Sequence, residues 1–160
     1  MVFISLIIYR WLFMSMKAEL LTPPYWINMG AVAITTLAGS RLLMYADTHE
    51  WIIGMRYFLP GITVFFWAFA TWWIPILFLL PVWRHVIQGV PVRYDPQYWS
   101  LVFPAGMYTV ATFNLSKALS LPFVMHISNT FIYFSMAAWV IVFTGMAGSF
   151  IRFTKNVKSA

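Results

Sequence analysis

The segment Phe58–Val86 constrains the fold of this chain more than any other feature. It contains no acidic residue, and no lysine or arginine precedes Arg84 in it. It is longer than the roughly 20 residues that a helix needs to cross the hydrocarbon core of a bilayer. A membrane β-barrel strand would alternate apolar and polar residues, and this segment does not. It is therefore expected to be a membrane-spanning helix.

Composition extends this expectation to the whole chain. Of the 160 residues, 62% are hydrophobic and 9% are charged, whereas about 45–50% and 25% are usual in soluble domains. A soluble globule cannot bury so much apolar surface, and a disordered chain would have the opposite balance. The chain has no cysteine, which excludes disulfides, thiolate metal sites and a cysteine nucleophile. The predicted fold class is an all-α, polytopic transmembrane protein.

Phe58–Val86 is the third of five hydrophobic segments in chain order, and short connections join them. The first, second, fourth and fifth segments cover about Met1–Met16, Tyr25–Tyr45, Tyr98–Leu119 and Ser128–Phe153. The opening segment is short for a span and lacks the basic start and the A-x-A-like cleavage site of a signal peptide. We expect four full spans and a truncated first one, in a single transmembrane domain over residues 1–160. On this interpretation the N-terminal part of the opening span is missing and further helices precede it.

Two helix starts carry recognisable signals. Thr22-Pro23-Pro24 precedes the second segment and Asp95-Pro96 precedes the fourth. Each pairs a side chain suited to the N-cap with a proline, which lacks the N–H that would have no acceptor in the first turn.

Basic residues are distributed unequally between the two sides that the spans would define. Side one carries Arg41, Arg56 and Lys117, and Arg10 lies within the first segment. Side two carries six basic residues, namely Lys17, Arg84, Arg93, Arg152, Lys155 and Lys158. The positive-inside rule places side two, and with it the C-terminus, in the cytoplasm of a bacterial-type inner membrane. The net charge of +6 is explained in this way without a nucleic-acid partner, and it also suits an anionic solute or an anionic lipid.

The second and fourth segments each carry a distinctive stripe. At about 100° per residue, Asn28, Ala31, Thr35 and Gly39 fall within about 80° of one another. Such a stripe is typical of close helix packing or of a pore wall. On the fourth segment one face holds a mixed set of side chains: Trp99, Phe103, Gly106, Val110, Asn114 and Lys117. Lys117 is close enough to the end of the span to reach the interface, and Pro104 is expected to kink the helix and re-aim Phe103.

Sites for catalysis, a metal or a cofactor are not indicated. His49, His85 and His126 lie in or beside loops without helical pairing, which argues against a bis-histidine haem site. His49 lies near Asp47 and Glu50 and could ligate a metal, although we favour a solvated loop histidine. The chain lacks a phosphate loop and the HExxH and GxSxG motifs. We expect no enzyme activity, no cofactor and no metal.

Two stretches of the chain resemble a known family. They are LTPPYWINMGAVAITTLAGS, Leu21–Ser40, and RYDPQYWSLVFPAGMYTVATFNL, Arg93–Leu115. Both are similar to the tellurite-resistance/dicarboxylate transporter family, which includes bacterial tellurite-resistance protein A and the slow anion channel of plant guard cells. The W-S-x-x-F-P-x-G-M-Y pattern is the most specific part, and the resemblance extends from about Val2 to Phe150.

The resemblance implies a fold of ten helices in five hairpins, in which odd-numbered inner helices line a central pore and a phenylalanine of helix nine plugs it. The present segments would be helices six to ten. The second and fourth segments would then be inner helices, with Phe103 as the gate. The pore-lining residues would be Asn28, Ala31, Thr35, Gly39, Trp99, Gly106, Val110, Asn114 and Lys117. It further implies transport of anions, which would be C4-dicarboxylates, tellurite, sulfite, or chloride and nitrate. The assembly that it implies is a homotrimer. Two inner helices do not enclose a pore, so the missing N-terminal half or a second chain would be a partner. The alternative function is a non-transporting scaffold or anchor subunit of a membrane complex.

Overall fold

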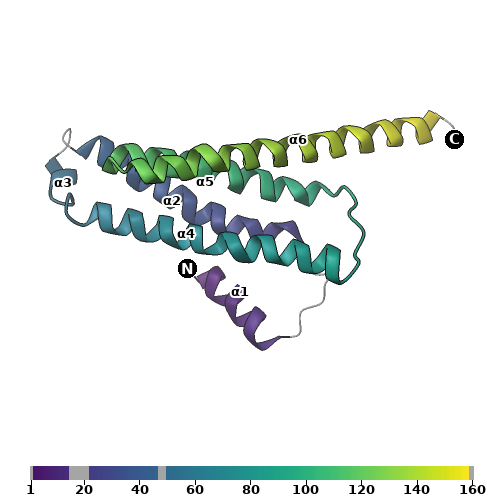
Figure 1. Ribbon diagram of the computed structural model, residues 1–160, viewed down its shortest axis with the longest axis horizontal. Helices are drawn as coiled ribbons and strands as arrows, with labels where there is room; N and C mark the ends of the chain where they lie inside the picture. Colours follow the sequence, from purple (N-terminus) through teal and green to yellow (C-terminus); the bar gives the residue numbers. More distant parts are fainter. Residues whose placement is uncertain (1, 15–21, 47–49, 159–160) are drawn as a thin grey trace.

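The computed structural model describes residues 2–14, 22–46 and 50–158. Within them the chain is helical and contains no strand (Figure 1). The main helices are α1 (Val2–Phe13), α2 (Trp26–Met44), α4 (Leu59–Val82), α5 (Trp99–Leu119) and α6 (Pro122–Lys158). Shorter elements are η2 (Pro23–Tyr25), α3 (Glu50–Ile53), the π-helical turn η4 (Trp83–Ile87) and η5 (Pro96–Tyr98). The predicted all-α membrane fold class is confirmed.

In the part of the chain that the structure describes, three helical stretches are long and apolar enough to cross a bilayer: Pro23–Met44, Leu59–Ile87 and Pro122–Lys155. The helix α5 has 21 residues, which is sufficient length, but its threonines, serines, Asn114 and Lys117 make it more polar. The bounds of α2, α4 and α5 lie close to those predicted. The helix α6 begins at Pro122, earlier than the expected Ser128, directly after Ser120 turns the chain with a positive φ of 53°.

The four long helices lie side by side, with α2 and α5 at the centre (Figure 1). The helix α4 packs on α2, and α6 packs on α5. Buried side chains at the core come from the three helices α2, α4 and α5: Trp26, Met29, Val32, Ala33, Ala70, Trp73, Leu77, Tyr108 and Ala111. The half-buried Ile7 and Ile8 of α1 pack against this core.

Glycines allow α2 to approach both of its neighbours closely. A Cβ at Gly30 would lie 2.9 Å from Cγ of Pro104 in α5, and a Cβ at Gly39 would overlap Thr63 of α4. Small residues serve this purpose in membrane helices, where close van der Waals packing holds helices together.

Hydrogen bonds from side chains fix α4 and α6 against α5. Trp67 Nε1 donates to Thr112 Oγ1 at 3.1 Å, and the hydroxyls of Thr71 and Tyr108 lie 2.8 Å apart. On the α6 side, Ser128 Oγ donates to the carbonyl oxygen of Thr109 at 2.9 Å. Because hydrocarbon offers no other partner, these bonds favour one arrangement of the helices.

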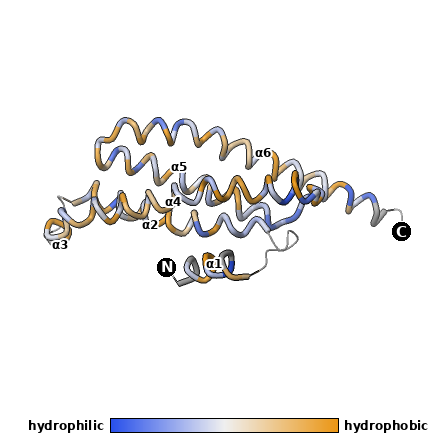
Figure 2. The backbone as a smooth tube through the Cα atoms, turned by 60° about the horizontal axis from the view of Figure 1, so that its bottom comes forward, coloured by the Kyte–Doolittle hydropathy of each residue, from blue (hydrophilic) through white to orange (hydrophobic). Residues whose placement is uncertain are grey.

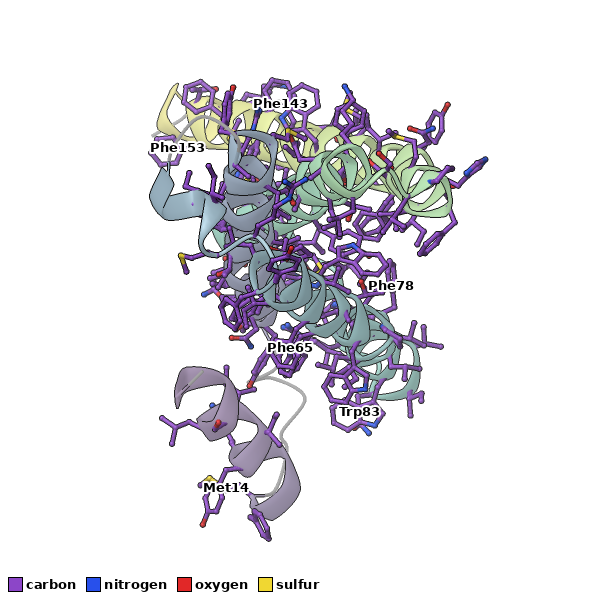
Figure 3. All side chains as sticks on the ribbon, turned by 90° about the vertical axis from the view of Figure 1, so that its left-hand side faces the viewer. Met14, Phe65, Phe78, Trp83, Phe143 and Phe153 are labelled. Carbon is purple, nitrogen blue, oxygen red and sulfur yellow. The ribbon has the colours of Figure 1, made fainter. Side chains whose placement is uncertain are left out.

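The outer surface of the bundle is strongly aromatic. Figure 3 shows Phe65 and Phe78 along α4, Trp83 at the start of η4, and Phe143 and Phe153 along α6. Four of them, Phe65, Phe78, Phe143 and Phe153, are exposed. Such a surface suits contact with lipid chains.

Candidate pore-lining face of α2 and α5

Charged residues collect at the two ends of the bundle. The starts of α2 and α5 lie together, because the short helices η2 and η5 that precede them are in contact. At the same end, Gly145 of α6 lies against Tyr94 of the loop before η5. Arg84, Arg93, Arg152 and Lys155 belong to this end, which we call the basic end, and polar residues mark it in Figure 2. Arg41, Arg56 and Lys117 belong to the opposite end. The grouping of these residues matches the two sides predicted, while Lys17 and the side chain of Lys158 lie outside the described part.

One side of the α2–α5 pair is covered by α4. Thr63 of α4 meets Gly39 of α2, and Trp67 and Thr71 of α4 bond to α5. At about 100° per residue, the exposed residues of α2 and α5 point to the opposite side of the pair. We call this surface the open face.

On α2 the predicted stripe divides between the open face and the helix contacts. Ala31 and Thr35 are exposed on the open face, and Thr35 Oγ1 donates to the carbonyl of Ala31 at 3.2 Å. Asn28 and Gly39 lie at the margin of this face. Asn28 is 8% exposed, and its Nδ2 has no hydrogen-bond partner in the described part of the chain. Gly39 is half-buried against α4.

On α5 the predicted face is largely open. Phe103 is 59% exposed and Val110 is 45% exposed. Gly106 is half-buried, and a Cβ there would meet no atom within 4 Å. Trp99 is half-buried at the helix start. Asn114 differs from the others because it is buried and donates from Nδ2 to the carbonyl of Val110 at 2.7 Å.

Lys117 lies at the end of α5 and is exposed. Its ammonium group is 4.3 Å from the ring centroid of Phe113. Phe113 was not predicted, although an aromatic residue four positions before a lysine signals such a contact on a helix. On α2, Ala38 was also not predicted as part of the stripe, and it is exposed on the open face together with Ala31 and Leu42.

Pro104 is fully buried against α2, directly beside the exposed Phe103. The helix continues through it from Trp99 to Leu119. Because consecutive residues are about 100° apart, anchoring Pro104 on α2 directs Phe103 onto the open face.

The histidines have ordinary loop or helix-end environments where they are described. His85 Nδ1 is 2.7 Å from the carbonyl of Val90, and His126 Nδ1 is 3.0 Å from that of Pro122. The candidate ligands His49, Asp47 and Glu50 lie outside the described side chains. Among the described residues, no three His, Cys, Asp or Glu side chains gather as a metal site would require.

A family model described as "Voltage-dependent anion channel" matches residues 1–147 of this chain. Uncharacterized membrane proteins from two strains of Mycobacterium tuberculosis, CDC 1551 and H37Rv, are 42% identical over 142 residues, which cover 89% of this chain and 72% of each relative. An uncharacterized transporter of Methanocaldococcus jannaschii is 20% identical over 138 residues, or 86% of this chain and 39% of that protein. No solved structure matches the chain.

Proposed function

Because the chain belongs to the voltage-dependent anion channel family, we propose that it is part of an anion-transporting membrane protein in which the open face of α2 and α5 forms one wall of the anion path. The family assignment confirms the resemblance to tellurite-resistance/dicarboxylate transporters. The proposal rests on one observation, which is that the exposed faces of α2 and α5 point in the same direction. Ala31, Thr35 and Gly106 leave room there, and the opposite side of the pair is packed against α4.

The electrostatics of this wall favour an anion. The helices α2 and α5 start together at the basic end, so the positive ends of both helix dipoles point to the same mouth. Lys117 places a positive charge near the other end of α5. An anion would therefore meet favourable potential at both ends, while the small and weakly polar residues between them would bind it weakly enough to let it leave.

Phe103 is proposed as the gate of this path. Its ring is exposed on the open face, and the packing of Pro104 on Gly30 fixes the backbone beside it. An apolar ring at a constriction blocks ions by its bulk and by excluding water. The proposed lining residues are Ala31, Thr35, Trp99, Gly106 and Val110. Asn28, Gly39, Asn114 and Lys117 are proposed to border the path.

Two helices cannot enclose a path, so the proposal includes further helices opposite the open face. A preceding half of the protein or a second copy of this chain, in a homotrimer or another assembly, would supply them. The archaeal transporter supports this requirement, because the matched residues make up only 39% of it. Transported anions are proposed to belong to the chloride, nitrate, sulfite, tellurite or C4-dicarboxylate type. The proposed location is a bacterial-type inner membrane with a cytoplasmic C-terminus, and the proposal assigns the chain no catalytic role.

Anion flux in liposomes tests the proposal. The full chain, and the same chain preceded by the N-terminal half of a full-length family member, would each be reconstituted and assayed for chloride and nitrate efflux. We expect flux at least from the longer protein, and we expect it to fall when Val110→Trp fills the open face. Matched Val140→Trp on α6 should leave flux unchanged, since Val140 is 47% exposed against 45% for Val110. Flux absent from both proteins, or equal in both tryptophan variants, would favour a scaffold role instead.

A further inference from the structure

A polar cavity at the basic end holds two arginines and lies apart from the open face. Its volume is about 690 Å³, and it lies between α6 and the loop that joins α4 to α5. Arg93 and Tyr94 line it from the loop, and Thr144, Gly148, Ser149 and Arg152 line it from α6. In Figure 1 this is the end where the C-terminal part of α6 projects beyond the other helices.

The two arginines line this cavity without a compensating negative charge. No aspartate or glutamate lines it, and no described residue forms an ion pair or hydrogen bond with Arg93 or Arg152. The nearest acid in the sequence, Asp95, instead caps η5 by accepting a hydrogen bond from the backbone N–H of Gln97 at 2.8 Å. Like charges at a common cavity repel each other, and an anion between them would remove this repulsion.

The loop is held to α6 in a way that brings the two arginines to one cavity. A Cβ at Gly145 would lie 2.9 Å from Cδ2 of Tyr94, so only a glycine admits the ring at this position. Tyr94 is the residue next to Arg93, and Gly145 lies two turns before Arg152 on α6. The Ser149 hydroxyl has no hydrogen-bond partner among the described residues and can donate to a ligand.

We propose that this cavity binds a phosphate-type oxyanion, held by the guanidinium groups of Arg93 and Arg152 and by the hydroxyl of Ser149. The planar guanidinium donates two parallel hydrogen bonds to phosphate oxygens, which makes arginine the usual partner for this chemistry. The cavity lies at the basic end, where the loop that carries Arg93 and Tyr94 leads into η5 and α5, and an aromatic-rich helix end of this kind suits the level of the lipid headgroups. Basic pockets between membrane helices bind the headgroups of anionic lipids, and free phosphate offers the same oxygen atoms.

The chain offers two independent ways to disable the site, each with a matched control. Arg93→Gln and Arg152→Gln remove one charge each, and Arg41→Gln makes the same change in an exposed residue at the opposite end. Gly148→Leu fills the cavity without altering charge, because a Cβ at Gly148 meets no atom within 4 Å. Gly61→Leu is its control, since Gly61 has equally free surroundings in α4 and lies outside the cavity.

The experiment has two arms. The lipid arm measures how strongly the full chain retains phosphatidylglycerol compared with phosphatidylcholine in nanodiscs that contain both lipids. The phosphate arm measures binding of inorganic phosphate to the full chain in neutral detergent by ³¹P line broadening. We expect Arg93→Gln, Arg152→Gln and Gly148→Leu each to weaken binding about tenfold or more, while both controls match the wild type. Loss in the lipid arm identifies a headgroup as the ligand, and loss in the phosphate arm alone identifies a free oxyanion. Binding by neither probe, or equal binding by cavity variants and controls that elute as folded protein, would overturn the proposal. Neither readout requires anion flux, so the result is independent of the proposed function.

Discussion

Pro104 of α5 lies directly against Gly30 of α2, at a distance that leaves no room for a side chain on residue 30. The contact joins the two helices of the open face and lies beside the proposed gate. A rigid proline ring cannot move aside as a flexible side chain would. The relative position of α2 and α5 therefore depends on the absence of one methyl group.

Gly30→Ala is accordingly expected to destabilise the protein. Its new Cβ would lie 2.9 Å from Pro104 Cγ, and overpacking of this kind typically costs about 1–3 kcal/mol. Gly61→Ala is the matched control, because a Cβ there meets nothing within 4 Å and alanine favours helix more than glycine does. Thermal unfolding in detergent compares the two variants. Equal melting temperatures would show that α2 and α5 do not pack as described.

The hydrogen bond from Trp67 to Thr112 predicts a smaller effect. Thr112 is fully buried and accepts from Trp67 Nε1 at 3.1 Å, so Thr112→Val leaves the indole N–H without this partner. Hydrogen bonds between membrane helices contribute about 0.6 kcal/mol on average, with a maximum near 1.7. Thr130→Val should have little effect, since the bond that the exposed Thr130 makes to a described residue stays within its own helix, to the carbonyl of His126. A double-mutant cycle with Trp67→Phe measures the coupling, and a value of zero would contradict the bond.

The distribution of basic residues predicts membrane orientation. Arg84, Arg93, Arg152 and Lys155 share one end of the bundle, and this end is expected to face the cytoplasm. A reporter that is active only in the cytoplasm should therefore be active when fused after Ala160. The opposite orientation would be revealed by labelling of a cysteine at residue 160 with a reagent restricted to the periplasm.

The exposed ring of Phe103 predicts a gain of flux on truncation. In a protein with a complete path, Phe103→Ala should raise chloride or nitrate current because it removes the constriction. If Phe103 were a packing residue, the same change would instead cost roughly 3–5 kcal/mol of stability. Phe65→Ala is the control, because Phe65 is similarly exposed, 50% against 59%, but lies on α4. Equal or lower current in a folded Phe103→Ala protein would rule out the gate.

Much of this fold could be predicted because bilayer helices are encoded by uninterrupted apolar runs. The start of α5 was also readable, since Asp95 caps η5 as its sequence suggests. Thr22 precedes η2 as predicted but makes no side-chain capping bond. The start of α6 was predicted at Ser128, although Pro122 at its first position is a helix-start signal. Ser120 turns the chain just before it in a left-handed conformation that its residue type does not favour.

The candidate site was only partly predictable for a different reason. A helical wheel gives the angle between side chains but does not say which helix lies at each angle. Gly39 shares a stripe with Ala31, yet it meets Thr63 of α4 while Ala31 remains open. Asn114 lies on the face of Phe103, yet its amide bonds to its own helix. Such differences arise from tertiary packing and become visible only when the neighbours are placed.

The most direct test of the anion path uses the absence of cysteine from the chain. Val110→Cys and Val140→Cys introduce single thiols at positions of nearly equal exposure, 45% on the open face and 47% on α6. An anionic, membrane-impermeant thiol reagent reacts with a thiol in water but not with one buried in lipid. We expect the reagent to label Val110→Cys and to block anion flux through the complete path, while Val140→Cys stays unlabelled. Labelling of Val140→Cys with none at Val110→Cys, in proteins that both conduct anions, would contradict the account.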